Sequence, residues 1–477
     1  MPMDDHEFAF HLAGAEHPIS GRRNVPHVLI SGGGLGGLML ALLLEKAGIS
    51  YLVLERAKEV KPLGAVMALS SGVLGIFEQL HLFEGLMGVS KPINDFKFFS
   101  NDLKSIGHLK GKEEKDQTGY ERLVFPRPEL YDLLLAKIPA EKIHLSKKVV
   151  AMIQDEDAVA VRCQDKSVYV ADILVGADGA YSGVRQSLYS RLEKEKLLPE
   201  CDKRSLNKGY FCLVGTTDRL DPVRFPQLRE VYSDASCMIS DNSPHSWSTF
   251  SVPGDRVCWN LVIQLTAKES EEEQFRNSEW GPEANESMIK SVAHFKTPYG
   301  TLGELINATP KETVSRVFLE DMLYQTWHHD RTVLIGDGMQ LERLNRQHLG
   351  PRLACWLLPS TGQGCVNAMQ DAAVLANCLY DMKTTSIEDV KAALEDYQEQ
   401  RFEHVKTQYE ASQWNAKVIY GHSFLERMLR QDLKWRSFLL SQIVDLFQPF
   451  LKNLPGDTLK SNKRFLFDVS ILVRRFF

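Results

Sequence analysis

A glycine-rich turn near the N-terminus most constrains what this chain can fold into. It has the pattern G-x-G-x-x-G, with glycines at Gly32, Gly34 and Gly37. In such a turn the first glycine permits a tight bend, the second lets a pyrophosphate approach the backbone, and the third lets helix and strand pack closely. The N-terminus of the following helix would offer free N–H groups and a positive dipole to the phosphates.

The residues around this turn complete a β-α-β pattern. Residues 28–30 predict a strand before the turn, and residues 38–47 predict an apolar helix after it. Residues 51–54 predict a second strand that ends on Glu55. An acid at this point, about 20 residues beyond the glycines, can accept hydrogen bonds from ribose hydroxyls. The segment therefore predicts dinucleotide binding, but an NAD-dependent dehydrogenase would begin in much the same way.

The composition is that of a soluble globular protein. The chain has 477 residues, of which 44% are hydrophobic and 25% charged, and this length predicts two packed lobes with an appendage. A formal net charge of -6 gives no electrostatic reason to expect nucleic acid. The eight cysteines form no C-x-x-C pair, which argues against a disulfide framework and against a structural zinc site. We therefore expect a cytoplasmic protein without a metal site.

The two ends of the chain predict less structure. Residues 1–24 lack the apolar region of a secretory signal and are interpreted as a disordered leader. No run in the sequence reaches the roughly 18 apolar residues of a membrane span. Residues 401–477 are expected to form a helical tail docked on the lobes. An amphipathic stretch in that tail could instead lie on a membrane surface.

Two later segments each predict a buried strand that ends in a turn containing an acid and a glycine. Residues 171–185 reach an Asp-Gly turn at Asp178, and residues 331–337 end in a Gly-Asp turn at Asp337. Residues 358–372 then predict a glycine-rich turn that leads into a helix. Three such motifs on one chain are far more specific than a single glycine-rich turn.

In this order the motifs resemble the three fingerprints of the group A flavoprotein monooxygenases, the para-hydroxybenzoate hydroxylase-like family. The resemblance covers residues 25–397. In detail the chain is most similar to fungal members of secondary metabolism, the meroterpenoid and indole-diterpene epoxidase-like group. The resemblance implies an α/β fold, in which a Rossmann-like, glutathione-reductase-like FAD-binding domain is combined with an antiparallel β-sheet substrate domain and a C-terminal helical tail.

The expected domains follow from the motifs and from a change of pattern after residue 200. Period-two runs separated by turns predict the antiparallel sheet on their own. These runs are residues 210–214, 231–232, 247–252 and 257–264. The boundaries we expect are 25–200 and 316–400 for the two parts of the FAD-binding domain, 201–315 for the substrate domain and 401–477 for the tail.

The family also implies which residues bind FAD. They are Gly32, Gly34, Gly37, Glu55, Gly64, Ala68, Arg127, Asp337, Gly364 and Cys365. Glu55 would bind the adenosine ribose, Arg127 would reach back to FAD from the start of a helix, and Asp337 would contact the ribityl and pyrophosphate region. The amides before Cys365 would face the pyrimidine edge of the flavin, where a helix N-terminus favours negative charge. Arg127 could also be an ordinary helix-terminal arginine.

Two residues are candidates for catalysis. Tyr210 lies in the predicted substrate sheet, and the related fungal enzymes use a tyrosine at the matching position. Arg185 could contact the cofactor or the nicotinamide, or it could simply pair with a nearby carboxylate. Asp178 could organise the backbone of its turn rather than bind a ligand.

The chemistry implied by the family belongs to the cofactor. NAD(P)H would reduce FAD, oxygen would form a hydroperoxide at flavin C4a, and one oxygen atom would hydroxylate or epoxidise a small organic substrate, aromatic or terpenoid-like. The family has no separate nicotinamide-binding domain, and accordingly the sequence has no second convincing G-x-G-x-x-G. The sequence does not distinguish NADH from NADPH. A reductase or desaturase of the same fold is the alternative enzyme.

The chain departs from the family pattern after Asp337. Family members continue through a short segment to P-x-x-G-Q-G, whereas here an insertion, residues 338–354, intervenes. We expect it to loop outward from the surface. A catalytically impaired FAD-binding homologue is the alternative, because the insertion falls in a turn that contacts the cofactor.

Overall fold

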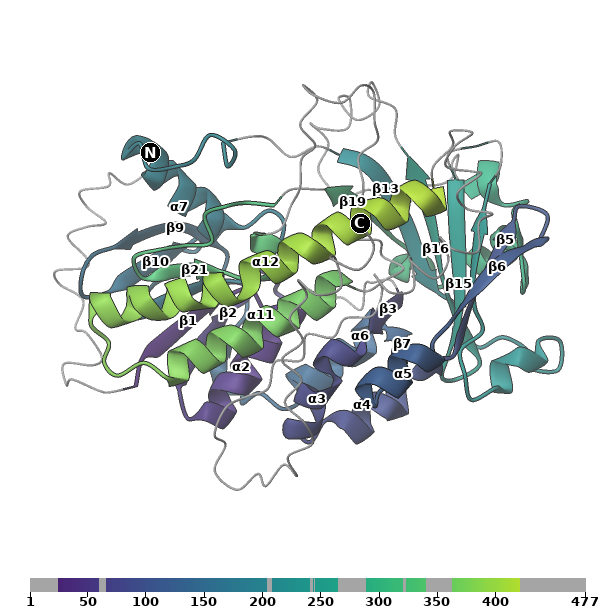
Figure 1. The fold of residues 1–477 in the computed structure, drawn as a ribbon, viewed down its shortest axis with the longest axis horizontal. Coiled ribbons are helices and arrows are strands. Elements are labelled where there is room, and N and C mark those ends of the chain that lie inside the picture. The colour runs from purple at the N-terminus through teal and green to yellow at the C-terminus, as the bar shows by residue number, and fades with distance from the viewer. Residues whose placement is uncertain are drawn as a thin grey trace, which may run out of the picture.

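The computed structural model describes residues 25–59, 66–203, 208–240, 243, 245–264, 289–320, 323–339 and 363–420. The predicted leader, Gly64, the insertion beyond Met339 and the tail beyond Tyr420 lie outside these ranges. Two lobes lie side by side, one around a six-stranded sheet and the other around a seven-stranded sheet. The long helix α12, Ile387–Tyr420, crosses the front of both (Figure 1).

The six-stranded sheet contains the predicted β-α-β unit and confirms it. Its order is β20-β21-β12-β1-β2-β8, with all neighbours parallel except β20 and β21. The strands are β1 (His27–Ser31), β2 (Ser50–Leu54), β8 (Ile143–His144), β12 (Ile173–Gly176), β20 (His328–His329) and β21 (Thr332–Leu334). Helix α2, Leu35–Ala47, follows β1 and ends at Gly48 in the left-handed conformation. The central strands β1, β2 and β12 are largely apolar because both faces of a parallel sheet are covered.

Helices and a small sheet provide that cover. Helices α2 and α11 (Gln363–Tyr380) pack against each other on one face, and α7 (Gly183–Lys194) packs with β9 on the other (Figure 1). The small sheet consists of β9 (Val149–Gln154), β10 (Val159–Cys163) and β11 (Val168–Ala171). The predicted helix start at Arg127 is confirmed by α6, Arg127–Leu135.

The seven-stranded sheet forms the core of the second lobe and has the order β19-β13-β16-β15-β14-β5-β6. Its neighbours are antiparallel except β14 and β5. The strands are β5 (Asp95–Ser100), β6 (Ser105–Lys110), β13 (Lys208–Thr216), β14 (Ala235–Ile239), β15 (His245–Val252), β16 (Arg256–Gln264) and β19 (Ser315–Glu320). The predicted turn between β15 and β16 is present, with positive φ at Gly254 and Asp255.

Two expectations for this sheet need correction. Residues 231–232 are not a strand, since Val231 is 74% exposed in a bend and the strand begins at Ala235. Strands β5 and β6 belong to this sheet although they lie in the segment assigned to the FAD-binding domain. They join it because β5 pairs in parallel with β14, for example Phe96 with Ala235.

The two faces of the large sheet contact different layers. One face packs its tryptophans Trp247 and Trp259 against α10, Leu302–Asn307, and the segment before it. The other packs Phe250 and Val252 against the strands β3 (Val66–Leu69) and β7 (Arg122–Pro126) of a three-stranded sheet with β4 (Lys91–Ile93). This second contact joins the large sheet to the first lobe. The three-stranded sheet is flanked by the helices α3 (Ser71–Gln79), α4 (Phe83–Val89) and α5 (Lys112–Thr118).

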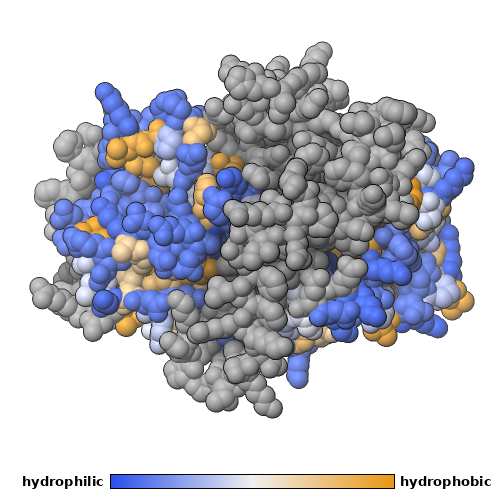
Figure 2. Space-filling view, in the orientation of Figure 1, coloured by the Kyte–Doolittle hydropathy of each residue, from blue (hydrophilic) through white to orange (hydrophobic). Residues whose placement is uncertain are grey.

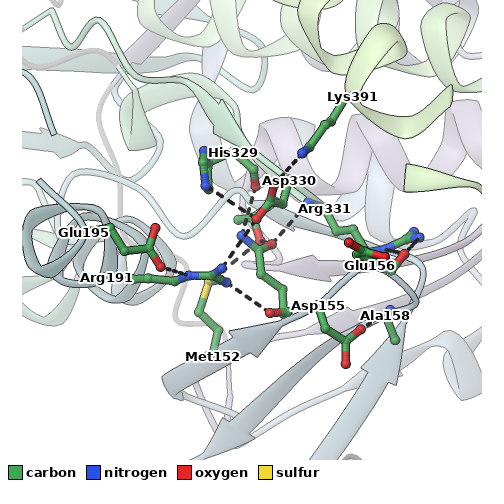
Figure 3. A network of polar contacts seen from close by, with 12 residues as sticks. Met152, Asp155, Glu156, Ala158, Arg191, Glu195, His329, Asp330, Arg331 and Lys391 are labelled. Carbon is green, nitrogen blue, oxygen red and sulfur yellow. Dashed lines mark hydrogen bonds and ion pairs between the residues drawn. The ribbon is translucent and has the colours of Figure 1, made fainter. Parts of the chain in front are cut away.

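An ionic network connects the edge of the six-stranded sheet to the helices α7 and α12 (Figure 3). Asp330 pairs with Lys391 of α12 at 2.9 Å and with Arg191 of α7 at 3.5 Å. The neighbouring Arg331 is buried and donates to the carbonyls of Asp172 and Thr385, each at 3.1 Å. These contacts hold the start of α12 against the first lobe.

The surface of the described residues is largely hydrophilic over both lobes in the view of Figure 2. None of the helices that the structure describes has both the length and the apolar character needed to cross a bilayer.

Candidate flavin site

A cavity of about 2830 Å³ joins the two lobes and brings the sequence motifs together. From the first lobe its wall includes the glycine-rich turn, the end of β2, the start of α6, the Asp178 turn, the Asp337 turn and the start of α11. From the second lobe it includes residues of α10 and the start of β19. Among the predicted cofactor residues, Gly32, Gly34, Glu55, Arg127, Asp337, Gly364 and Cys365 line it.

The three glycines of the turn meet different surroundings. Gly32 has φ +110°, and a Cβ there would lie 2.4 Å from the Ala177 carbonyl oxygen. A Cβ on Gly37 would lie 2.0 Å from the carbonyl oxygen of Gly32. A Cβ on Gly34 would meet no atom of the described residues within 4 Å. Gly32 and Gly37 therefore shape the turn, while Gly34 leaves open space for a phosphate group at the N-terminus of α2.

Glu55 is held at the end of β2 by backbone amides. Its Oε2 accepts a hydrogen bond from the Gly33 amide at 2.7 Å, and its Oε1 accepts one from the Ala57 amide at 2.8 Å. The side chain is half-buried and lines the cavity. Each carboxylate oxygen can accept more than one hydrogen bond, so Glu55 retains capacity for ribose hydroxyls.

The Asp178 turn is organised by its own carboxylate. Asp178 Oδ2 accepts hydrogen bonds from the amides of Gly183 at 2.8 Å and Val184 at 3.3 Å, at the start of α7. Its Oδ1 is buried and has no hydrogen-bond partner among the residues that the structure describes. Burial raises the pKa of Asp178. Asp178 lines the cavity, but this oxygen is buried, so the carboxylate organises the turn.

Arg185 lies behind that turn. Its guanidinium donates to the Ala180 carbonyl at 2.6 Å and lies 4.6 Å from the centre of the Tyr324 ring. Arg185 is buried and is not among the residues that line the cavity. These contacts support the turn, and a role of Arg185 in the chemistry stays a prediction.

Asp337 follows β21 in a short helical turn, Gly336–Gly338. Its side chain opens into the cavity, yet the surrounding protein removes enough water to raise its pKa, and nearby Asp371 adds to this effect. The positive charges of Arg127 and Arg185 act in the opposite direction. A Cβ on Gly364 would lie 3.9 Å from Asp337 Oδ1, so the turn and the start of α11 are adjacent.

The first turn of α11 contributes Gly364 and Cys365. Cys365 is buried, and burial raises the pKa of its thiol to about 12, so the thiol is protonated at neutral pH. The backbone N–H groups of this turn have no partner inside the helix and can donate to a ligand. They suit an acceptor with partial negative charge.

Three further predicted residues have no described side chain on the cavity wall. Ala68 in β3 is buried and is not a lining residue, whereas its neighbour Met67 lines the cavity. Tyr210 lies in β13 opposite Gln264 and Leu319, and its side chain lies outside the described residues. Gly64 lies outside them altogether.

Several lining residues were not predicted from the sequence. Lys147 and Lys148 lie beside the end of β2, since the Lys147 amide donates to the Glu55 carbonyl at 2.8 Å. On the other lobe the wall includes Ile306 and Arg316, and the Arg316 guanidinium lies 4.1 Å from the centre of the Phe211 ring. These residues come from segments without a recognisable motif, so no local pattern could have identified them.

The observed features fit FAD. Open space at Gly34 and the fixed carboxylate of Glu55 lie on the cavity wall, which also includes Asp178. Together with the N-terminus of α11 they offer donors and acceptors to the ribose, pyrophosphate and ring portions of a dinucleotide.

Comparisons with known proteins agree with this fit. The FAD binding domain family matches residues 26–202. The FAD-dependent monooxygenase ptmM of Penicillium ochrochloron is 27% identical over 399 residues, which cover 81% of this chain and 87% of that protein. The FAD-dependent monooxygenase prhF of Penicillium brasilianum is 28% identical over 403 residues, covering 82% and 78%.

Solved structures share the fold. HpxO of Klebsiella pneumoniae, complexed with FAD and uric acid, superposes with a TM-score of 0.68 at 19% identity and covers 88% of this chain and 96% of its own. The 2,6-dihydroxypyridine-3-hydroxylase of Arthrobacter nicotinovorans has a TM-score of 0.64 at 17% identity, covering 85% and 95%. The predicted resemblance, fold class, enzyme class and cofactor FAD are confirmed, because over most of its length the chain is similar to FAD-dependent monooxygenases.

Proposed function

We propose that this enzyme uses NAD(P)H and oxygen to hydroxylate or epoxidise a small organic substrate, aromatic or terpenoid-like. One observation carries the proposal: a single cavity connects the FAD-binding motifs of the first lobe with the inner wall of the second. A substrate in the second part would therefore lie next to the cofactor. The fungal relatives ptmM and prhF are named FAD-dependent monooxygenases, which supports the same reaction class.

The first lobe would hold the cofactor at both ends. Glu55 would accept hydrogen bonds from the adenosine ribose, and the turn at Gly34 would receive the pyrophosphate on the N-terminus of α2. Arg127 and Asp337 would contact the middle of the molecule. The amides of Gly364 and Cys365 would donate to the pyrimidine edge of the ring. Bound FAD supplies the electron transfer and oxygen activation.

The second lobe would bind the substrate and exclude water. Ile289, Ile306 and Val314 give its wall an apolar surface, while Thr309 and Arg316 add a few polar groups. A mostly apolar wall with a few polar contacts is typical of sites for small organic ligands. Exclusion of water strengthens the electrostatic contacts inside such a site.

Tyr210 is the residue that we propose for catalysis. A phenol can donate a hydrogen bond or a proton to charge that develops during oxygen transfer, and such help contributes about a hundredfold or more to rate. We expect Y210F to retain FAD and to lose oxygenation of substrate by about that factor. Y232F is the matched control, because Tyr232 is 40% exposed and its hydroxyl pairs with Glu121. Equal activity of Y210F and wild type would remove Tyr210 from the proposal.

The reaction itself is tested on the purified yellow protein. NADH and NADPH oxidation and oxygen consumption are measured with a panel of phenolic and prenylated compounds, and products are analysed after reaction under ¹⁸O₂. We expect at least one compound to stimulate NAD(P)H oxidation and to gain one labelled oxygen atom. Substrate turnover without label in the product would identify a reductase or desaturase instead. Flavin that NAD(P)H does not reduce with any compound would indicate the catalytically impaired homologue.

A further inference from the structure

Helix α12 delivers an arginine to the buried side of the flavin site. It lies along α11 (Figure 1), and its Arg401 meets Asp371 of that helix. Arg401 Nε donates to Asp371 Oδ1 at 2.7 Å, and both side chains are fully buried, each with 0% exposure. A carboxylate at this depth needs a partner, because desolvation of an unpaired charge is costly.

The other oxygen of Asp371 holds the cofactor-binding turn. Asp371 Oδ2 accepts a hydrogen bond from the Gly336 amide at 3.1 Å. Gly336 precedes Asp337, has φ +60°, and a Cβ there would lie 3.0 Å from the Cβ of Ala368. One carboxylate therefore connects Arg401 to a turn that is closely packed on α11.

Arg401 also reaches the first turns of α11 directly. Its Nη2 donates to Asn367 Oδ1 at 3.2 Å, and Asn367 lies two residues beyond Cys365. The guanidinium thus bridges both segments that line the cavity on this side. A planar group with several donors can make two such contacts at once, which an ammonium group on a single stem cannot reproduce in the same geometry.

The preceding turn of α12 contacts the residues on both sides of the Asp337 turn. The Tyr397 hydroxyl donates to the Leu334 carbonyl at 3.2 Å and lies 3.4 Å from the sulfur of Met339. Leu334 precedes the Asp337 turn, and Met339 follows it. Two residues of α12 therefore hold the turn, Tyr397 at its flanks and Arg401 through Asp371.

We propose that Arg401 is a positioning residue of the flavin site, which holds the Gly336–Asp337 turn through Asp371 and the start of α11 through Asn367 in the arrangement that binds FAD. This inference rests on the proposed FAD contacts of Asp337 and of the first turn of α11. It makes α12 a part of the cofactor site, although residues from 401 onward were assigned to a peripheral tail.

The test compares R401L with R331L. Arg331 is a matched control, since it is equally buried, bonds to backbone carbonyls and does not line the cavity. For each purified apoprotein, urea unfolding gives the stability, and titration of the folded protein with FAD gives the dissociation constant and the visible spectrum of the bound flavin. We expect both variants to lose stability, but only R401L to bind FAD at least about tenfold more weakly, with a shifted flavin spectrum.

Two further variants keep the test decisive if R401L does not fold. R401K retains the charge and should show a smaller loss of affinity than R401L. The double variant R401L/D371N removes the buried charge, while the asparagine oxygen still accepts from the Gly336 amide, so its FAD affinity should recover above that of R401L or, if R401L cannot be measured, equal or exceed that of R401K.

The inference is overturned if folded R401L and R401K both bind FAD with the wild-type constant and spectrum. It is also overturned if R331L weakens FAD binding as much as R401L. Failure of the proposed function would look different, because FAD would still bind to the wild type, and the variants would still differ in affinity, while no compound gained labelled oxygen.

Discussion

Glu55 and Gly33 are joined by a hydrogen bond across the first β-α-β unit, with Glu55 Oε2 accepting from the Gly33 amide at 2.7 Å. The acid that ends β2 therefore stabilises the glycine-rich turn that ends β1. The same carboxylate lines the cavity at the end proposed for the adenosine ribose. Its two contacts to backbone amides fix its position before any ligand binds.

Replacement of Glu55 should therefore weaken FAD binding. Hydrogen bonds to a charged group are worth about 1.5–3 kcal/mol, so E55A should raise the dissociation constant of FAD by about 10- to 100-fold. E45A is the control, because Glu45 lies on the same unit but pairs with Lys142 away from the cavity. Flavin content and FAD titration measure the effect. Purification of E55A with full flavin content and unchanged affinity would show that the assignment of Glu55 is wrong.

Substitutions of Gly34 and Gly37 should have different effects, the first on FAD binding and the second on folding stability. Gly34 has φ -75° and open space at its Cα, so G34A should change the stability of the apoprotein by no more than about 0.5 kcal/mol while weakening FAD binding. G37A would bring a Cβ within 2.0 Å of the Gly32 carbonyl oxygen and should cost about 1–3 kcal/mol or more. Urea unfolding and FAD titration of both variants check this. Wild-type FAD affinity in G34A would contradict a pyrophosphate at that position.

His404 should make stability depend on pH. Burial lowers the pKa of His404 to about 3, and Arg401 acts in the same direction. The unfolded chain, with a histidine pKa of about 6.5, therefore binds a proton below that pH that the folded protein does not. Stability falls as the pH drops, and between about pH 7 and pH 5 the loss through this one group should be about 2 kcal/mol.

H404Q isolates this contribution. The variant should lose less stability than the wild type over the same pH interval, as measured by urea unfolding of the apoprotein at each pH. An identical pH dependence of the two proteins would show that His404 takes up its proton equally well in the folded and unfolded states.

The parts of the fold that could be predicted have local causes. Gly32 and Gly37 are required by sterics within one turn, and the alternation of residues 247–252 and 257–264 with a turn at Gly254 predicts the hairpin of β15 and β16. Both patterns are contained in a few consecutive residues. The β-α-β unit and most of the substrate sheet followed from such patterns.

The parts that could not be predicted depend on distant partners. The parallel pairing of β5 with β14 joins Phe96 to Ala235, and nothing in either segment indicates the other. Val231 and Tyr232 have strand propensity, but they lie in an exposed bend before β14. The bridge from Arg401 through Asp371 to Gly336 likewise leaves no local pattern, because its residues come from three separate segments.

The structure moves the start of the removable segment after Asp337 from residue 338 to residue 340. The sequence predicts that residues 338–354 loop outward from the surface. Met339, however, is fully buried, accepts a hydrogen bond from the Tyr324 amide at 3.2 Å and contacts the Tyr397 hydroxyl. Gly338 and Met339 thus belong to the turn that α12 holds, and a deletion should begin at residue 340.

Deletion of residues 340–354 with a short linker should keep or increase FAD affinity. The entropic cost of closing a loop grows slowly, by about 0.6 kcal/mol for each doubling of its length. A shorter connection should therefore stabilise the folded protein slightly, and it should leave FAD binding intact if the insertion has no role in the site. A second variant replaces the same residues with an equally long Gly/Ser segment, which separates the effect of length from that of sequence. FAD titration of both variants gives the result. If both lose a tight FAD complex that the full chain forms, the insertion is an integral part of the flavin site.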